Sequence, residues 1–482
     1  MAAVNWRAPV RDRHGRTKSR ARSLAFAVMM VAGTATVVVA PASAVPFDGV
    51  VQPAPPFVSS PAIPEFDSFY RPPADVVAAK QPGEIIAARQ VNVATYNVLP
   101  LNVDAWQLSY RSNNSRDEPI GAVATVLKPR GEVPRGSRNL LSYHMAEDST
   151  GKYCASSYSI QQWALPGFVT GQLVAPIGFL EVQVALQQGW AVVVPDHQGP
   201  NAAFAHGPLA GRIALDGIRA AENFTPMGLD GAATKVGMMG YSGGSVPTMW
   251  AAEMRKTYAP ELNIVGAVSG GTDADLGELV NLANNNAASG LVYAGIIGLA
   301  HEEPEFAAFL RETNNPLGQA LLTGKDQLCV GFQAALFPFM NIKGLFDTPG
   351  DPLATPAAQA VIERTRMGKS VPDMPVFLYQ ANMDWLVPVG PVNKLYGTYC
   401  QDPNARVTYT RDHFSEHLSL EGIGLPSAMM WMRDRFAGVP VESGCQLDEV
   451  GSMALDSRTW GEWVSIIGGE LAAFFGQSIG TR

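Results

Sequence analysis

The sequence is poor in charged residues and in cysteine. Only 16 % of its 482 residues are charged, while 47 % are apolar. This excludes a disordered chain, because disorder requires low hydrophobicity and high net charge. No Gly-X-Y period or heptad run is present, which excludes fibrous folds. Four cysteines are too few for a small disulfide scaffold, and none is in the C-x-x-C spacing of a metal or redox site.

Basic residues are scarce outside the first 44 positions. Residues 1–44 hold seven basic side chains and one acidic side chain, whereas the remaining residues hold 28 basic and 42 acidic ones. A body this acidic repels phosphate backbones, so we expect no nucleic-acid partner.

The N-terminal segment has the pattern of a secretory signal peptide. An apolar run from Leu24 to Ala40 follows the basic start, Pro41 breaks the run, and residues 42–44 (Ala-Ser-Ala) form a small-x-small cleavage site. The alternative is an uncleaved membrane anchor, for which this run is marginally short. We therefore expect secretion after cleavage near Ala44, without a stable transmembrane anchor. Outside the cytoplasm, the four cysteines predict two disulfides with three possible connectivities.

The body of the chain alternates strand and helix patterns, which predicts an α/β fold with a mostly parallel, doubly wound sheet. Residues 190–196 form a continuous apolar run typical of a strand buried on both faces. Residues 212–224 have helical spacing. Further strands are predicted at 262–271, 374–383 and 405–410, the last of which we expect to end the sheet.

The same patterns predict the domain boundaries. Residues 45–91 are rich in proline and are expected to form an extended arm. The α/β core spans 92–272 and 373–445. Residues 273–372 interrupt it with helical patterns and little strand signal, and are too long for an ordinary connection, so we expect an inserted cap domain. Residues 446–482 form a C-terminal extension.

A nucleophile motif lies between a predicted strand and a predicted helix. Residues 240–244 read Gly-Tyr-Ser-Gly-Gly and fit G-x-S-x-G. In this context the motif predicts a nucleophile elbow, a strained turn that exposes the Ser242 hydroxyl above the sheet. Glycine is expected two residues before and two residues after Ser242, because the turn packs so closely that side chains there would clash. The N–H of Gly243 is a candidate oxyanion donor. Rival motifs are incomplete: Gly368-Lys369-Ser370 lacks the leading glycine of a P-loop, and there is no H-E-x-x-H.

The base and the acid follow from the order Ser, acid, His that this fold uses. His413 and His417 both follow a strand downstream of the serine, and spacing alone does not separate them. Asp384 comes directly after the preceding strand, where the acid that orients the histidine is expected.

Several segments resemble the secretory lipase family over nearly all of the chain after the leader, from about Phe66 to Cys445. They are FYRPP (69–73), HMAEDST (144–150), PDHQGP (195–200), ALDGIRA (214–220), GYSGG (240–244), YAPELNIVGAVSGGT (258–272), DWLVP (384–388) and SEHLSLE (415–421). The resemblance implies an α/β-hydrolase with a helical cap that hydrolyses acylglycerols and other carboxylic esters. It implies no cofactor and no metal.

The resemblance also implies roles for individual residues. It assigns Ser242 as nucleophile, Asp384 as acid and His417, rather than His413, as base. It places Gly243 and Asp148 at the oxyanion hole, where Asp148 would donate through a protonated carboxyl or through its backbone N–H. Asp196 and His197 are expected to be structural, and Glu147 to support the loop. The four cysteines match family positions that imply the pairs Cys154–Cys329 and Cys400–Cys445.

Three functions compete at this point. The first is a secreted esterase or lipase that acts through an acyl-enzyme on an ester substrate, either in solution or at a lipid–water interface. The second is an acyltransferase that uses the same triad with an alcohol in place of water. The third is a non-catalytic lipid-binding surface protein. Apolar stretches at 288–300 and 334–342 of the predicted cap are expected to hold the acyl chain.

Overall fold

The computed structural model describes residues 49–131, 133–165, 167–172 and 174–480. The predicted signal peptide and its cleavage site lie outside these residues. Among the described helices, none is both long enough and apolar enough to cross a membrane.

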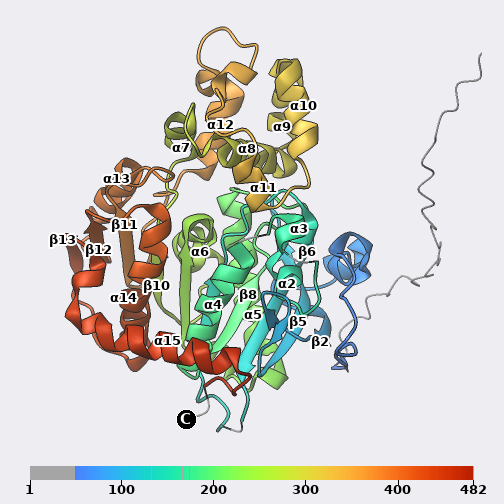
Figure 1. Cartoon of the computed structure of the whole chain (residues 1–482), viewed down its shortest axis with the longest axis vertical. Coiled ribbons are helices and arrows are strands. Elements are labelled where there is room, and N and C mark those ends of the chain that lie inside the picture. The colour runs from blue at the N-terminus through green and yellow to red at the C-terminus, as the bar shows by residue number, and fades with distance from the viewer. Residues whose placement is uncertain (1–48, 132, 166, 173, 481–482) are drawn as a thin grey trace, which may run out of the picture. The chain divides into compact units, whose positions relative to one another are not determined.

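An 11-stranded sheet runs through the centre of the described chain (Figure 1). Its spatial order is β1-β2-β5-β6-β8-β7-β9-β10-β11-β12-β13. Its strands are β1 (Val51–Gln52), β2 (Ile85–Gln90), β5 (Val103–Asn113), β6 (Pro119–Pro129), β7 (Leu140–His144), β8 (Ala191–Pro195), β9 (Val236–Tyr241), β10 (Ile264–Gly270), β11 (Val376–Ala381), β12 (Arg406–Asp412) and β13 (Gly444–Val450). β3 (Ala94–Thr95) and β4 (Leu99–Pro100) pair separately.

The strand directions confirm the prediction of a mostly parallel sheet. All neighbouring pairs from β8 to β13 are parallel, whereas β2, β5, β6 and β8 pair antiparallel in succession. β8 and β9 are buried at every position, and for β8 the continuous apolar run at 190–196 predicts this burial. Because β9, β10, β11 and β12 run in one direction, the loops that follow them meet at one edge of the sheet.

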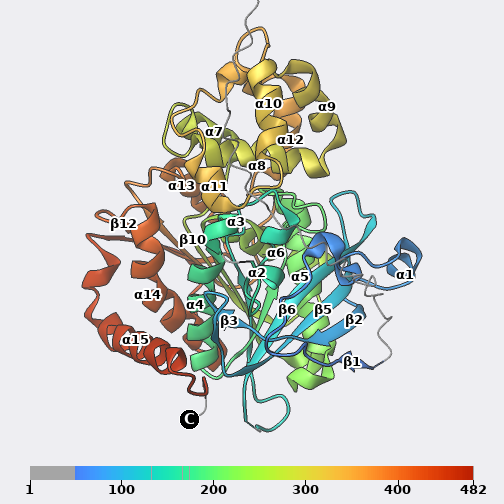
Figure 2. The ribbon, with the colours of Figure 1, turned by 45° about the vertical axis from the view of Figure 1, so that its right-hand side comes forward.

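Helices cover both faces of the sheet (Figures 1 and 2). α5 (Gly207–Asn223), α6 (Ser245–Tyr258) and α13 (Val389–Tyr399) pack on one face, and α4 (Val174–Gln187) and α14 (His417–Ala437) pack on the other. α5 and α6 are in close contact, since a Cβ on Gly211 would lie 2.9 Å from the backbone of α6. The short helices α1 (Ala74–Ala78), α2 (Ser156–Ser159) and α3 (Gly167–Thr170) precede α4.

The segment between β10 and β11 forms the predicted helical cap. Its apolar side chains make a separate core, which Leu386 and Val387 from the loop after β11 join. In both views the cap helices lie together beyond the edge of the sheet where β10 ends (Figures 1 and 2). They are α7 (Leu276–Ala283), α8 (Ser289–Glu302), α9 (Pro304–Thr313), α10 (Pro316–Lys325), α11 (Val330–Ala335) and α12 (Pro356–Thr365).

The sheet extends further at both ends of the chain than the sequence patterns predict. β1 and β2 lie inside the proline-rich arm of residues 45–91, and β13 follows β12, which was expected to be the last strand. β13 pairs with β12 from Arg406↔Gly444 to Asp412↔Val450, so the sheet continues beyond residue 445. The sequence pattern does not predict β13, because this edge strand has no fully buried residue and therefore lacks an apolar run.

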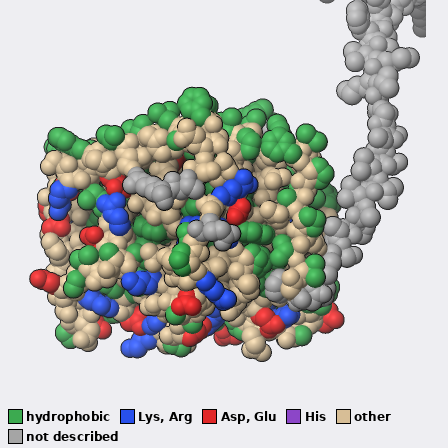
Figure 3. All heavy atoms as spheres, turned by 90° about the horizontal axis from the view of Figure 1, so that it is seen from below, with side chains coloured by type: hydrophobic (Ala, Val, Ile, Leu, Met, Phe, Trp, Pro, Cys, Tyr) green, Lys and Arg blue, Asp and Glu red, His purple; other side chains and the backbone are tan. Residues whose placement is uncertain are grey.

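The C-terminal extension ends in a helix that packs on the body. α15 (Trp460–Phe474) contacts α4 and α14, and buries Ile466 and Ala473. It lies at the end of the sheet away from the cap and does not cover it (Figure 1). Figure 3, which looks from that end, shows hydrophobic side chains gathered along one rim of the surface. Large apolar side chains on the outer face of α15 are more than half exposed: Trp460, Val464, Ile467, Leu471 and Phe474.

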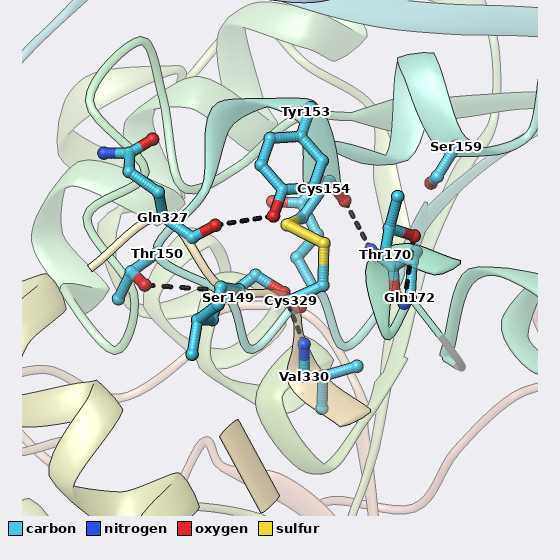
Figure 4. Close-up of a disulfide and its surroundings, with 12 residues drawn as sticks. Ser149, Thr150, Tyr153, Cys154, Ser159, Thr170, Gln172, Gln327, Cys329 and Val330 are labelled. Atoms are coloured by element: carbon cyan, nitrogen blue, oxygen red, sulfur yellow. Dashed lines mark hydrogen bonds between the residues drawn. A yellow bond between two sulfur atoms is a disulfide. The ribbon is translucent and has the colours of Figure 1, made fainter. Parts of the chain in front are cut away.

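The two disulfides are the pairs that the resemblance implies. Cys154–Cys329 joins the loop after β7 to the cap segment between α10 and α11, and Cys400–Cys445 joins the end of α13 to β13. Figure 4 shows the hydrogen bonds around the first bridge. The Tyr153 hydroxyl donates to the Gln327 carbonyl at 2.6 Å. The N–H of Val330 donates to the Ser149 hydroxyl at 3.1 Å. The loop after β7 is therefore bound to the cap at several points.

Removal of either bridge is expected to destabilise the protein according to the length of the chain it closes. The sequence separations are 175 and 45 residues. In the chain-entropy model, replacing both cysteines of Cys154–Cys329 by alanine lowers the free energy of unfolding by about 5 kcal/mol, and the same change at Cys400–Cys445 lowers it by about 4 kcal/mol. Urea denaturation of the two double variants and the parent measures both values. A larger loss at the shorter loop contradicts this ranking.

Candidate active site

The Ser242 side chain lies at the turn between β9 and α6. Its φ is +53°, in the left-handed region that L-residues rarely adopt. Residues 242–244 form a single 3-10 turn, and α6 begins at Ser245. This is the strand–turn–helix geometry that the G-x-S-x-G motif predicts.

The glycines around Ser242 are required by close packing. A Cβ on Gly240 would lie 2.1 Å from the carbonyl oxygen of Gly244, and a Cβ on Gly244 would lie 2.1 Å from the carbonyl oxygen of His144. A Cβ on Gly243 would meet the Asp148 carboxyl. Backbone leaves no room for a side chain at Gly240 or Gly244, whereas a side chain at Gly243 would displace the Asp148 carboxyl.

His417 contacts both Ser242 and Asp384. Its Nε2 is 2.7 Å from the Ser242 Oγ, and its Nδ1 is 2.7 Å from the Asp384 Oδ2. The ring is almost fully buried and packs against the Tyr241 ring at 5.3 Å. The Tyr241 hydroxyl donates to the His417 carbonyl at 2.6 Å. These contacts hold the imidazole in line between a hydroxyl and a carboxylate.

Asp384 is oriented by the backbone of its own loop. Its Oδ1 accepts the N–H groups of Leu386 and Val387 at 2.9 and 2.7 Å. Its Oδ2 accepts from the side-chain amide of Gln380 at 3.0 Å in addition to contacting His417. The carboxylate is thereby fixed with one oxygen facing the imidazole.

Two acidic residues that motif reasoning did not assign position the histidine. Glu416 caps α14 in a reciprocal capping box with Ser419, and it also accepts the indole N–H of Trp385 at 2.8 Å. Asp412 accepts the N–H groups of Phe414 and Ser415 at 3.0 and 2.8 Å. An acidic N-cap followed three residues later by Ser419 is the available sequence signal for Glu416.

The structure separates the two candidate histidines. His413 is 46 % exposed, and its Nε2 lies 2.6 Å from the Glu449 carboxylate on β13. It is held in a surface pair, whereas His417 contacts the serine. Spacing could not make this distinction because the two residues are only one helical turn apart in sequence.

Asp148 lies beside Gly243 in the loop after β7. It is buried with a φ of +42°, and its Oδ1 has no hydrogen-bond partner among the described residues. Burial raises the pKa of this carboxyl to about 7, and the negative charge of Glu147 adds to the rise. Its backbone N–H is 3.0 Å from the Gln198 side-chain oxygen when that amide is oriented to satisfy both of its neighbours. The carboxyl oxygen Oδ1 is therefore a buried polar atom of this residue that is left without a partner among the described residues.

Other buried polar residues near this loop have structural partners. Glu147 accepts the N–H of Ser156 at 2.9 Å, which matches its expected supporting role. Asp196 accepts both the N–H and the hydroxyl of Ser157. His197 contacts the Met145 carbonyl at 2.7 Å. None of these side chains contacts Ser242 or His417 in the described structure.

A largely apolar cavity opens beside Ser242. Ser242, Gly243, Asp148 and Asp273 contribute its polar lining, and most of its apolar lining comes from α7 and α8. A second apolar cavity lies within the cap. The two share four lining residues, namely Leu276, Val280, Ile296 and Leu299.

The fold and this site define the class of the protein. A mostly parallel sheet, a nucleophile elbow after a central strand, and a serine–histidine–carboxylate chain at the carboxyl edge of the sheet are the features of an α/β-hydrolase. Residues 172–444 match the family model described as secretory lipase. The chain belongs to the secretory lipase family.

Similar proteins are bacterial and fungal. A secreted triacylglycerol lipase of Malassezia globosa is 33 % identical over 430 residues, covering 87 % of this chain and 91 % of the relative. A protein of Mycobacterium tuberculosis named as a probable inactive lipase is 37 % identical over 382 residues, covering 79 % and 84 %. The solved structure of Candida antarctica lipase A matches with a TM-score of 0.76 and 27 % identity, covering 88 % of this chain and 99 % of that one.

Proposed function

We propose that this protein is a secreted serine hydrolase of carboxylic esters, of the triacylglycerol lipase or esterase type. The observation that carries the proposal is the unbroken chain of contacts from Asp384 through His417 to Ser242, which ends beside an apolar cavity. Such a chain serves to activate a hydroxyl, and such a cavity suits an acyl chain.

The proposed reaction proceeds through an acyl-enzyme. His417 Nε2 takes the proton of the Ser242 hydroxyl as Oγ attacks the ester carbonyl carbon, and Asp384 stabilises the imidazolium. His417 then gives this proton to the alcohol oxygen as the carbon–oxygen bond of the ester breaks. Water repeats the sequence, losing a proton to His417 as it attacks the acyl-enzyme, and the carboxylic acid leaves as Ser242 recovers its proton.

Asp148 and Gly243 are the proposed donors to the oxyanion. The N–H of Gly243 lies at the start of the turn before α6, and the Asp148 carboxyl lies against the same glycine. A carboxyl donates only in its protonated form. The raised pKa of about 7 keeps Asp148 neutral at slightly acidic pH, so that it can donate to the developing negative charge.

The two adjoining cavities are the proposed site for the acyl chain. Their shared lining comes from α7 and α8, so apolar side chains of these helices border both the space beside Ser242 and the space inside the cap. α8 corresponds closely to the apolar stretch at 288–300 that the sequence singles out. The stretch at 334–342 contributes Ile342 to the inner cavity.

The intact site supports an active enzyme over a non-catalytic lipid-binding protein. One similar protein is named as probably inactive, so family membership alone does not establish turnover. In this chain the nucleophile, the base and the acid are in hydrogen-bond contact. Secretion is supported by the N-terminal signal pattern, by the two disulfides and by the secreted relatives.

Replacement of the nucleophile or the base is expected to abolish turnover. Ser242→Ala and His417→Ala should each lower kcat on p-nitrophenyl butyrate by roughly 10⁴-fold or more, because the members of a triad act as a unit. His413→Ala is the matched control and should retain most of the activity, since His413 pairs with Glu449 at the surface. An inactive His413→Ala variant together with an active His417→Ala variant would reverse the assignment of the base.

Replacement of Asp148 is expected to change the pH dependence as well as the rate. Asp148→Ala removes a donor and should lower kcat by roughly 10²-fold or more. In the parent, deprotonation of Asp148 removes the donor as the pH rises through about 7, so this carboxyl contributes a decline in kcat on the alkaline side.

Asp148→Asn supplies the control for that decline. Its amide donates at every pH, so the variant should keep more activity than Asp148→Ala and lose the Asp148 contribution to the alkaline decline. Profiles of kcat against pH for the three proteins measure this. Equal activity of Asp148→Ala and the parent would show that the carboxyl does not stabilise the oxyanion.

A bulky residue on α8 is expected to shorten the acyl chains that the enzyme accepts. Gly295 lines the cavity beside Ser242, and a Cβ there would meet only ordinary contacts at 3.6 Å or more. Gly295→Phe should therefore lower the ratio of kcat/KM for p-nitrophenyl palmitate over p-nitrophenyl acetate. Ala294 is fully buried and does not line the cavity, so Ala294→Trp would disturb the cap core instead. An unchanged ratio for Gly295→Phe would place chain-length selection elsewhere.

A further inference from the structure

Asp273 is a second carboxyl in the wall of the active-site cavity, and the triad and oxyanion hole do not use it. It follows β10 and precedes α7, and it lines the same cavity as Ser242, Gly243 and Asp148. Its backbone N–H donates to the hydroxyl of Ser245, the first residue of α6. Asp273 is thus attached to the nucleophile turn itself.

The Asp273 side chain has no partner in the described protein. Its Oδ1 is closed off from solvent and makes no hydrogen bond with any described residue. The charged groups that act on it are Asp275 and Asp148, both acidic, and it forms no ion pair with a described basic residue. Burial raises the pKa of the Asp273 carboxyl to about 7, and the two negative charges add to the rise. A buried polar group without a hydrogen-bond partner either binds a ligand or lowers the stability of the fold.

Structural roles for this acid are already filled by its neighbours. Asp275 caps α7 by accepting the N–H groups of Gly277 and Glu278, and it pairs with Arg366 at 2.8 Å. The acid of the triad is Asp384. No hydrogen bond of the Asp273 carboxyl supports the fold, so its position in the cavity wall is what distinguishes it.

The position of Asp273 indicates which part of a substrate it would meet. Two residues earlier, a Cβ on Gly271 would lie 3.0 Å from His417 Cε1, so this segment starts against the imidazole. Three residues later, Leu276 lines both cavities. Asp273 therefore belongs to the segment that leads from the imidazole to the residues bordering both cavities, and it lines the wall beside Ser242. An acyl chain that extended along this cavity from an ester carbonyl at Ser242 would lie against the wall that holds Asp273.

We propose that Asp273 binds a hydroxyl group carried by the acyl chain close to the ester carbonyl, so that the enzyme favours hydroxyacyl esters such as 3-hydroxyacyl esters. This inference rests on the proposed ester hydrolysis and on the proposed acyl path. A carboxyl in an apolar wall can accept a hydrogen bond from such a hydroxyl, and in its neutral form it can also donate one. The remainder of the lining near this point consists mainly of apolar side chains, which cannot pair with a hydroxyl.

A matched pair of substrates tests the proposal on the full-length mature protein. The probes are p-nitrophenyl octanoate and p-nitrophenyl 3-hydroxyoctanoate, and the measured quantity is the ratio of kcat/KM for the hydroxylated over the plain ester. The parent should prefer the hydroxylated ester. Asp273→Leu should lower that ratio by roughly tenfold, the value of one hydrogen bond in a dry site. Asp273→Asn, which keeps hydrogen-bonding atoms, should retain most of the preference.

A control variant and the parent protein keep the test decisive. Glu278→Leu removes an exposed acid from α7, the helix that follows Asp273, without touching the cavity lining, and its ratio should equal that of the parent. If Asp273→Leu does not fold, the kcat/KM ratio of the parent still tests the proposal. A cavity wall without a hydrogen-bond partner for the hydroxyl would disfavour the hydroxylated ester. Hydrolysis of plain esters with a ratio below one overturns this inference and leaves the proposed function standing. No hydrolysis of either ester overturns both.

Discussion

The active site depends on close packing around the strained turn at Ser242. Ser242 has a φ of +53°, and Gly240 and Gly244 leave room for the backbone that packs against this turn. The carbonyl that approaches Gly244 belongs to His144, the last residue of β7. One contact therefore places the nucleophile turn against the strand from which the Asp148 loop starts. A side chain at Gly244 would move both parts of the site at once.

The loops around this turn are held by carboxylates that accept backbone N–H groups. Asp384 fixes the loop after β11, Asp412 fixes the histidine loop after β12, and Glu147 fixes the loop after β7. Glu416 links two of these loops through the Trp385 indole. Charge-assisted hydrogen bonds of this kind are short and directional. They explain how a histidine at the start of α14 reaches both partners at 2.7 Å.

Burial favours the protonated form of two carboxyls in the cavity wall, those of Asp148 and Asp273. Asp384 has four hydrogen-bond partners, whereas Asp148 and Asp273 each have an oxygen with none. Burial raises the pKa of both to about 7, and the negative charges of neighbouring acids add to the rise. The acid beside the imidazole is thus held by hydrogen bonds on both oxygens, whereas the two acids in the cavity wall are not. The cap supplies much of the apolar wall and is bound to the Asp148 loop through Cys154–Cys329.

The sequence by itself determined the features that are encoded locally. The elbow at Ser242, the buried parallel strands, the helical insertion and the acid after β11 each depend on residues that are adjacent in the chain. The resemblance of short segments to one family added the base, the oxyanion residues and the disulfide pairs. The tertiary structure decided what depends on distance between loops. It brings His417 rather than His413 against Ser242, places the Asp148 carboxyl against Gly243, and sets two cavities against the same side chains of α7 and α8. It also shows that β13 extends the sheet and that the buried Oδ1 of Asp273 has no hydrogen-bond partner among the described residues. These features follow from strand register and side-chain packing between segments far apart in sequence, and no local pattern records them.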